Sequence, residues 1–360
     1  MSAAHARLSF SGLGHGERTR LFDEIQHLDI ETLGPAEPAR FGDSRGWLIS
    51  DMSIGRWLLT SSVGVKSRPK DSQLRLGGVG ARQGESVRSL KRELVLAMGS
   101  VASDRSLMER HLFAALESMA GPVDGAHLTE ALTSSTLTLL AAAEPGSVPG
   151  KQLRELVFGT WADVEAGGPG SVVDALYRFI LDLLRTSRSP FMTSLRNRDW
   201  TAEEVAEELR AMFLAGWGST AAAVLSSISL GVAERLAEEF VFDEVIRLYP
   251  PSFMIGRTIA EVTAGQPFRL GDVVLISPWL IHRNPRGWSE PARFDVGRWR
   301  ERGVGSPWFL PFGLGPRRCP AATFARAQAA TAGRLLRNEP RPQTTTTTLV
   351  EGRSPALTAG

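Results

Sequence analysis

The chain has 360 residues, of which 42% are hydrophobic and 22% charged, a composition typical of a globular protein long enough for one large core or two domains. Its formal net charge of +2 argues against a general nucleic-acid-binding protein. The one cysteine excludes an intramolecular disulfide, and residues 1–20 lack the apolar core of a signal peptide or membrane anchor. We therefore expect a cytoplasmic protein.

The first half of the chain predicts a small sheet followed by helices. Residues 40–70 hold short alternating stretches separated by glycines, which indicate strands. From about residue 85 to residue 184 the hydrophobic period is helical, with breaks at Pro145–Gly150 and Gly167–Gly170. The uncharged stretch Ala211–Ala233 is long enough to span a membrane, but its glycines and serines favour a buried helix of a soluble fold.

A long central helix is expected from Thr201 to beyond Leu230. Thr201 and Glu204 have the spacing of a capping box, in which each side chain accepts a hydrogen bond from the other residue's backbone N–H. A shorter helix over Phe240–Tyr249 is expected to end at Pro250-Pro251.

The last third of the chain predicts strands, one helix and a strand-like tail. Residues 255–278 alternate in strand fashion around a turn at Gly271-Asp272. A final helix is expected from Pro320, at its first position, to Leu336. The threonine run at residues 344–348 predicts a further strand because threonine is β-branched.

The loop before the final helix carries the lone cysteine, Cys319. At the N-cap of that helix its thiolate would be stabilised by the helix dipole, and Arg317 would add a permanent cation. Gly313 and Gly315 let the backbone fold tightly around a bulky group, and Phe312 supplies an apolar shield. A shielded thiolate can bind iron. The alternative is a buried structural cysteine.

The spacing Phe-x-x-Gly-x-Arg-x-Cys-x-Ala resembles the haem-binding loop of the cytochrome P450 family. The resemblance implies haem b (iron protoporphyrin IX), with the Cys319 thiolate as a ligand of the iron. Ala321 stands where the family more often has glycine. The resemblance places the following residues at the haem: Cys319, Arg317, Arg257, Lys91, Phe312, Gly313, Gly315 and Ala215.

A second motif lies in the central helix, at Ala215-Gly216-Trp217-Gly218-Ser219-Thr220. One helical face of mostly small residues could lie against a flat cofactor, although close helix packing explains the same pattern; it consists of Met212, Ala215, Gly216, Ser219, Ala222 and Ala223. The stretch resembles the oxygen-binding bend of the family, where an acid and a threonine relay protons. Gly218 stands in the place of the acid and Ser219 in that of the threonine. The resemblance assigns catalytic roles to Gly216, Ser219 and Thr220.

The third motif is Glu244-x-x-Arg247, an i,i+3 pair that by itself is typical of a solvated helix surface. Together with Arg293, the pair resembles the buried Glu-Arg-Arg triad of the family. That triad would fix the cysteine loop, which is a structural role.

The haem propionates need cationic partners, and the resemblance assigns this role to Arg257, Arg317 and Lys91. Lys91 stands where the family usually has arginine, and Arg88 or Arg92 could substitute for it; a solvated helix face is the alternative. His282 is interpreted as structural. The expected substrate-pocket residues are Met212, Trp217, Ser252, Phe253, Met254 and Ile255.

The resemblance implies one mainly α domain over residues 1–360, with minor β portions at about 40–70, at 255–280 and in the C-terminal tail. Haem would lie between the long central helix and the Cys319 loop. The implied function is a bacterial monooxygenase of secondary metabolism that oxidises a small organic molecule. Electrons would come from NAD(P)H through ferredoxin reductase and a ferredoxin, which we expect to dock on the arginines between Ile281 and Arg302. We expect a monomer that binds neither nucleic acid nor membrane.

Two alternatives remain open. The first is a haem-thiolate enzyme that does not hydroxylate, since Gly218 supplies no carboxylate; it would catalyse oxidative coupling, dehydration, nitrogen-oxide chemistry or a peroxide-driven reaction. The second is a haem-binding carrier or gas sensor without turnover.

Overall fold

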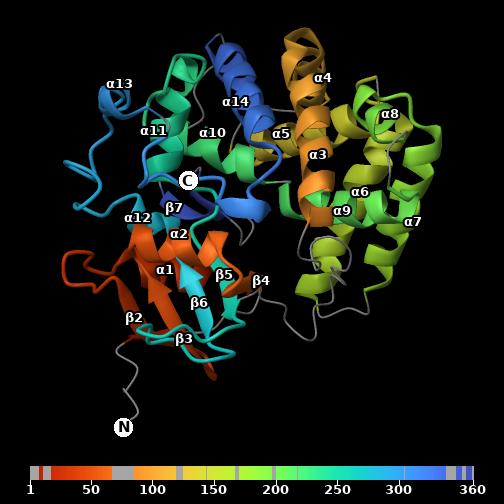
Figure 1. Cartoon of the computed structure of the whole chain (residues 1–360). Helices are drawn as coiled ribbons and strands as arrows, with labels where there is room; N and C mark the ends of the chain where they lie inside the picture. Colours follow the sequence, from red (N-terminus) through yellow and green to blue (C-terminus); the bar gives the residue numbers. More distant parts are fainter. Residues whose placement is uncertain are drawn as a thin grey trace. The chain divides into compact units, whose positions relative to one another are not determined.

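The structure is a computed structural model in which the chain forms two compact units (Figure 1). Unit 1 contains residues 1–68, 239–319 and 347–356, and unit 2 contains residues 69–238, 320–346 and 357–360. The residues described are 8–10, 18–66, 85–118, 125–142, 144–166, 170–196, 200–216, 218–303, 305–337, 346–350 and 354–358. The prediction of a single domain over residues 1–360 stays a prediction.

Unit 1 is built on a mixed sheet with the strand order β1-β2-β3-β6-β5-β4. Its strands are β1 (Leu8–Phe10), β2 (Ala36–Phe41), β3 (Ser44–Ile49), β4 (Gly64–Lys66), β5 (Ile255–Ile259) and β6 (Val273–Ile276). The pairs β1–β2 and β3–β6 are parallel, and the others are antiparallel. The strands expected at residues 40–70 and 255–278 are therefore confirmed, and they belong to one sheet.

Side-chain alternation along the strands places a separate core on each face of this sheet. In β3, Trp47 and Ile49 belong to one apolar cluster and Leu48 to the other. Leu275 of β6 packs in the same cluster as Leu48, together with Phe22 of helix α1 (Arg18–Gln26). Helix α2 (Met52–Thr60) was not expected from the sequence; it contributes Leu58 to the other cluster.

The remaining helices of unit 1 follow the second half of the sheet. They are α11 (Val241–Leu248), α12 (Pro278–Ile281), α13 (Arg298–Arg302) and the 3-10 turn η4 (Gly315–Arg317). The expected helix at Phe240–Tyr249 is confirmed as α11, for which these two residues are the caps.

Unit 2 is a bundle of helices around one large apolar cluster, as expected for residues 85–184. Its helices are α3 (Glu85–Ser103), α4 (Arg105–Glu117), α5 (Gly125–Ala141), α6 (Val148–Glu165), α7 (Ser171–Thr186), α8 (Pro190–Arg196), α9 (Ala202–Gly216), α10 (Ser219–Ser229), η3 (Ala233–Arg235) and α14 (Ala322–Leu336). The threonine-rich tail, most of which belongs to unit 1, forms β7 (Thr346–Val350), which pairs with β8 (Ser354–Thr358).

The central helix begins as expected but is broken. The Thr201 and Glu204 side chains each accept a hydrogen bond from the other residue's backbone N–H, at 3.2 and 3.1 Å. The helix does not continue past Leu230: α9 ends at Gly216, and Gly218 is the N-cap of α10, which ends at Ser229. The stretch Ala202–Ser229 is long and apolar enough to cross a membrane, since an 18-residue window within it has a mean hydropathy of 1.4, but 59% of that window is buried, which is typical of a core helix.

Candidate active site

The loop that carries Cys319 is folded back on itself by its own backbone. The Cys319 N–H donates to the Phe312 carbonyl at 2.9 Å, and the Gly313 N–H donates to the Leu310 carbonyl at 3.0 Å. Gly313 and Gly315 have φ values of 68° and 71°, the left-handed region that favours glycine. The tight loop predicted from the two glycines is therefore confirmed, and the Cys319 side chain at its end is exposed.

The helix after this loop begins later than expected. Its N-cap is Ala321, whose carbonyl accepts the first helical hydrogen bond from the Ala325 N–H at 2.8 Å. The prediction of Cys319 as the N-cap is therefore wrong, because the Cys319 N–H is tied back to Phe312 and Arg318 is extended (ψ 143°). The thiol lies outside the helix.

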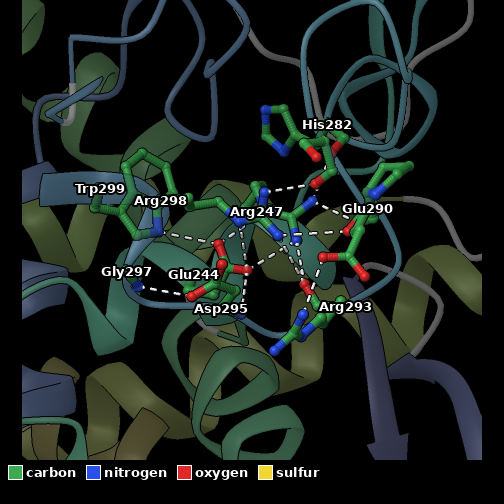
Figure 2. A network of polar contacts seen from close by, with 11 residues as sticks. Glu244, Arg247, His282, Glu290, Arg293, Asp295, Gly297, Arg298 and Trp299 are labelled. Atoms are coloured by element: carbon green, nitrogen blue, oxygen red, sulfur yellow. Dashed lines mark hydrogen bonds and ion pairs between the residues drawn. The ribbon is translucent and has the colours of Figure 1, made fainter. Parts of the chain in front are cut away.

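A buried ion pair on α11 lies at the centre of a polar network in unit 1 (Figure 2). Arg247 and Glu244 are both 0% exposed, and the guanidinium forms two hydrogen bonds of 2.8 Å with the carboxylate. The other three N–H donors of Arg247 bind the carbonyl oxygens of His282, Pro291 and Arg293 at 2.8 to 3.0 Å. All five guanidinium donors are thus used, and the predicted buried Glu-Arg pair is confirmed.

The third member of the triad differs from the prediction. The Arg293 side chain is 64% exposed and pairs with Glu290, so only its carbonyl oxygen takes part. Its predicted place is taken by Arg298, which is 7% exposed and donates from Nε to Glu244 Oε1 at 3.2 Å. The reason is the path of the loop, which turns the Arg293 carbonyl inward and its side chain outward.

Two tryptophans complete the network, and the sequence analysis missed both. Trp299 Nε1–H donates to Glu244 Oε2 at 3.0 Å, and the Trp288 ring lies 5.1 Å from the Arg247 guanidinium. Phe309, at the start of the cysteine loop, packs edge-on against Trp299 with ring centroids 4.6 Å apart. For Trp299 the available signal was the indole N–H, since a buried tryptophan usually finds an acceptor.

His282 links the network to the cysteine loop, as a structural residue. It is fully buried, and its Nε2 accepts a hydrogen bond from the Leu310 N–H at 3.0 Å. The ring is therefore neutral, with its proton on Nδ1. Burial, followed by the charges of Arg247 and Arg283, lowers the pKa of His282 to about 3.

This lowered pKa predicts acid sensitivity. Because the unfolded chain takes up a proton near pH 6.5 and the folded chain does not until about pH 3, stability should fall as the pH drops through this window. The loss attributable to His282 should reach about 2 to 3 kcal/mol at pH 4.5. Urea unfolding at pH 7.5 and 4.5 should show a smaller difference in His282→Gln than in the wild type. The exposed His27 provides the control, and equal pH dependence in His282→Gln and His27→Gln would contradict the prediction.

Two arginines near the loop fit an anionic group. Arg257 on β5 is 7% exposed, and its one polar contact among the described residues is a hydrogen bond of 2.8 Å to the Gly256 carbonyl. Burial, and then the nearby positive charge of Arg317, lower the pKa of Arg257 to about 10. A buried cation with a second cation beside it and no carboxylate needs a negative charge. The haem propionates would supply one, so these residues fit the predicted cofactor.

Lys91, Arg88 and Arg92 lie on α3 of unit 2, where Lys91 is half-buried and the two arginines are exposed. A propionate contact from any of them stays a prediction.

The small-residue motif lies at the break between α9 and α10. Ala215 and Gly216 are exposed, and a Cβ on Gly216 would meet no atom within 4 Å. Ser219 and Thr220 are half-buried in the first turn of α10, and Trp217 lies outside the described residues. The expected face does not continue as predicted, because the break separates it from Ala222 and Ala223, which are fully buried.

The predicted pocket residues have different surroundings. Ser252 is exposed, and its Oγ donates to the Met254 carbonyl at 3.0 Å. Phe253 is 2% exposed and packs edge-on against Phe22 at 5.1 Å, so it belongs to the core of unit 1. Ile255 lies beside the cysteine loop, since its Cδ1 is 3.8 Å from where a Cβ on Gly313 would be.

The remaining two pocket residues pack on the cores. Met254 packs on the same cluster as Phe253, and Met212 packs on the core of unit 2. Roles of these residues toward a substrate stay predictions.

The surface that we expected to bind a ferredoxin, between Ile281 and Arg302, has fewer exposed arginines than predicted. Arg298 is buried against Glu244, and the Arg283 guanidinium lies 3.4 Å from the centre of the Trp279 ring. The exposed arginines of this stretch are Arg286, Arg293 and Arg300; the side chain of Arg302 lies outside the described residues.

Residues 239–338 match the cytochrome P450 family profile, and this range contains α11, the polar network and the cysteine loop. The whole chain has the same fold as solved cytochromes P450. It superposes on the mycinamicin VIII C21 methyl hydroxylase of Micromonospora griseorubida with a TM-score of 0.71 at 17% identity, covering 92% of this chain and 94% of the other.

The chain has the cytochrome P450 fold. A second P450 structure, CYP175A1 from Thermus thermophilus, matches with a TM-score of 0.67 at 21% identity, covering 98% and 100% of the two chains.

Curated relatives match over a shorter range. Cyclooctatin synthase of Streptomyces melanosporofaciens is 38% identical over 97 residues, and pentalenene oxygenase of Streptomyces avermitilis is 33% identical over 109 residues. These matches cover 26% and 29% of this chain. The matched part spans 21% and 23% of the length of the two relatives.

Proposed function

We propose that this protein is a haem-thiolate monooxygenase that oxidises a small organic molecule in secondary metabolism. The observation that carries the proposal is the lone thiol at the end of a tight loop in the same unit as Arg257, a buried cation that lacks a carboxylate partner among the described residues. The names of the curated relatives, which include an oxygenase and a monooxygenase of Streptomyces, support this class of reaction.

In the proposed reaction, individual residues bind the haem, shield the sulfur or transfer protons. Cys319 would ligate the haem iron, Arg257 and Arg317 would bind the propionates, and Phe312 would shield the sulfur from water. A haem held by these residues would supply oxygen activation: with two electrons and two protons, one atom of molecular oxygen would enter the substrate and the other would leave as water. At the start of α10, the Ser219 and Thr220 hydroxyls would hold and pass protons.

The proposal is tested by identifying the protein ligand of the haem iron from the carbon monoxide spectrum. Electron donation by the Cys319 thiolate should move the Soret band of the reduced carbon monoxide complex far to the red of that in histidine-ligated haem proteins. Cys319→His should abolish the shift, whereas Ser252→Ala, at an exposed hydroxyl of the same unit, should preserve it. A wild-type spectrum like that of myoglobin would refute the proposal.

We further propose that electrons come from NAD(P)H through a reductase and an acidic ferredoxin, and that the protein is a cytoplasmic monomer. The exposed Arg286 and Arg300 are candidate docking residues, since opposite charges speed association. Arg298 is not one, because its guanidinium is occupied by Glu244.

Gly218 favours a second candidate, a haem-thiolate enzyme that does not hydroxylate. Gly218 is the buried N-cap of α10 and brings no carboxylate to the bend. In hydroxylation we therefore expect electrons to leak to hydrogen peroxide, and Gly218→Asp should lower the ratio of peroxide to product. Tight coupling in the wild type, with no change in Gly218→Asp, would mean that protons arrive by another route. Equal turnover with peroxide alone would favour the second candidate.

A further inference from the structure

Glu208 of α9 is a buried carboxylate that none of the described residues of unit 2 neutralises. Its side chain is 8% exposed, and the Oε2 atom is shielded from solvent and receives no hydrogen bond. Among the described residues of the chain, none forms an ion pair with it. The adjacent Glu207 differs, because it pairs with Arg210 at 2.8 Å.

An ionised carboxylate is costly to bury without a counter-charge, so the burial of Glu208 without a cationic partner has to be explained. Arg210 does not supply one. It lies about 200° around the helix axis from Glu208, and its guanidinium faces Glu207 and the Tyr177 ring, whose centroid is 5.5 Å away. A positively charged molecule bound beside Glu208 would supply the missing charge.

The position of Glu208 on the helix indicates where that molecule lies. Glu208, Met212 and Ala215 have i, i+4 and i+7 spacing, so they share one face of α9 over a length of about 10 Å. At the C-terminal end of α9, Ala215 is exposed and a Cβ on Gly216 would meet no atom within 4 Å. Met212 and Ala215 are the residues of this helix that we place beside the substrate and the haem.

We propose that Glu208 is a specificity-determining residue that binds a positively charged nitrogen of the substrate, an ammonium or quaternary ammonium group. The inference rests on the proposed function, since it takes this face of α9 as the substrate side. A bound cation would neutralise the buried carboxylate, whereas an uncharged analogue would leave it unpaired. The carboxylate thus selects for the cation and against its neutral isostere.

A matched pair of probes tests the inference. Benzyltrimethylammonium and neopentylbenzene differ only in a charged nitrogen that replaces a carbon, and neither can ligate iron. Isothermal titration calorimetry on the haem-loaded protein should show at least about tenfold tighter binding of the cation. Glu208→Gln should lose this preference, and Glu207→Gln, whose carboxylate serves Arg210, should keep it. Failure of the cation to bind the wild type, or an unchanged preference in Glu208→Gln, would overturn the inference.

Thermal unfolding without probe gives a second readout. Removal of an unpaired buried charge should leave the melting temperature of Glu208→Gln equal to or above that of the wild type, whereas Glu207→Gln breaks a pair and should melt lower. A fall in Glu208→Gln would indicate a structural carboxylate and overturn the inference. The carbon monoxide spectrum of the same sample separates the two proposals, because thiolate ligation without cation preference refutes only the role of Glu208.

Discussion

Replacement of Glu244 by alanine should lower the free energy of unfolding by about 3 to 5 kcal/mol and yield protein with little haem. The carboxylate accepts hydrogen bonds from Arg247, Arg298, Trp299 and the backbone N–H of Asp295. Its loss leaves the Arg247 guanidinium fully buried without a counter-charge. The measurements are urea unfolding and the haem-to-protein ratio after purification.

Two further variants sharpen this test. Arg247→Lys keeps the charge but cannot reach five acceptors, so it should behave like the alanine variant of Glu244. Arg293→Ala removes a side chain that is 64% exposed, and it should unfold within about 0.5 kcal/mol of the wild type. An Arg293→Ala variant as damaged as Glu244→Ala would restore Arg293 as the third member of the triad.

Gly315→Ala should destabilise the cysteine loop much more than Gly313→Ala. Both glycines have a positive φ, which costs other residues about 1 to 2 kcal/mol. A Cβ on Gly315 would in addition overlap the Leu59 carbonyl oxygen of α2, and displacing packed backbone costs about 1 to 3 kcal/mol more. A Cβ on Gly313 would only touch Ile255 at 3.8 Å, an ordinary contact.

The carbon monoxide spectrum and the unfolding free energy of both variants provide the measurement. We expect Gly315→Ala to lose a large part of its thiolate-type spectrum and Gly313→Ala to keep it. Equal losses in the two variants would show that backbone conformation alone, and not the contact with α2, determines the loop.

The parts of the site that the sequence predicted are local patterns. Glu244 and Arg247 are one helical turn apart, and Gly313, Gly315 and Cys319 belong to one short loop, so their spacing in the sequence fixes their geometry. Strands and helix ends could be predicted because they too are local: alternation of side chains predicts strands, and the capping box predicts the start of α9.

The errors concern residues whose positions depend on the path of a loop or on distant packing. Arg293 and Arg298 are five residues apart in an irregular stretch, and no periodicity indicates which of them turns inward. Phe253 enters the core because Phe22, more than 200 residues earlier, lies beneath it. Glu208 escaped notice because it belongs to a run of acidic residues that has the composition of a solvated helix face.

The polar network around Arg247 also determines which residues of this region can be substituted without loss of the fold. Arg247 holds residues 282, 291 and 293 by their main-chain carbonyl oxygens, which every amino acid possesses. Substitutions at positions 291 and 293 therefore leave the anchor intact as long as the backbone path is kept. The surface residues between His282 and Asp295 can thus change while the attachment of the cysteine loop stays the same.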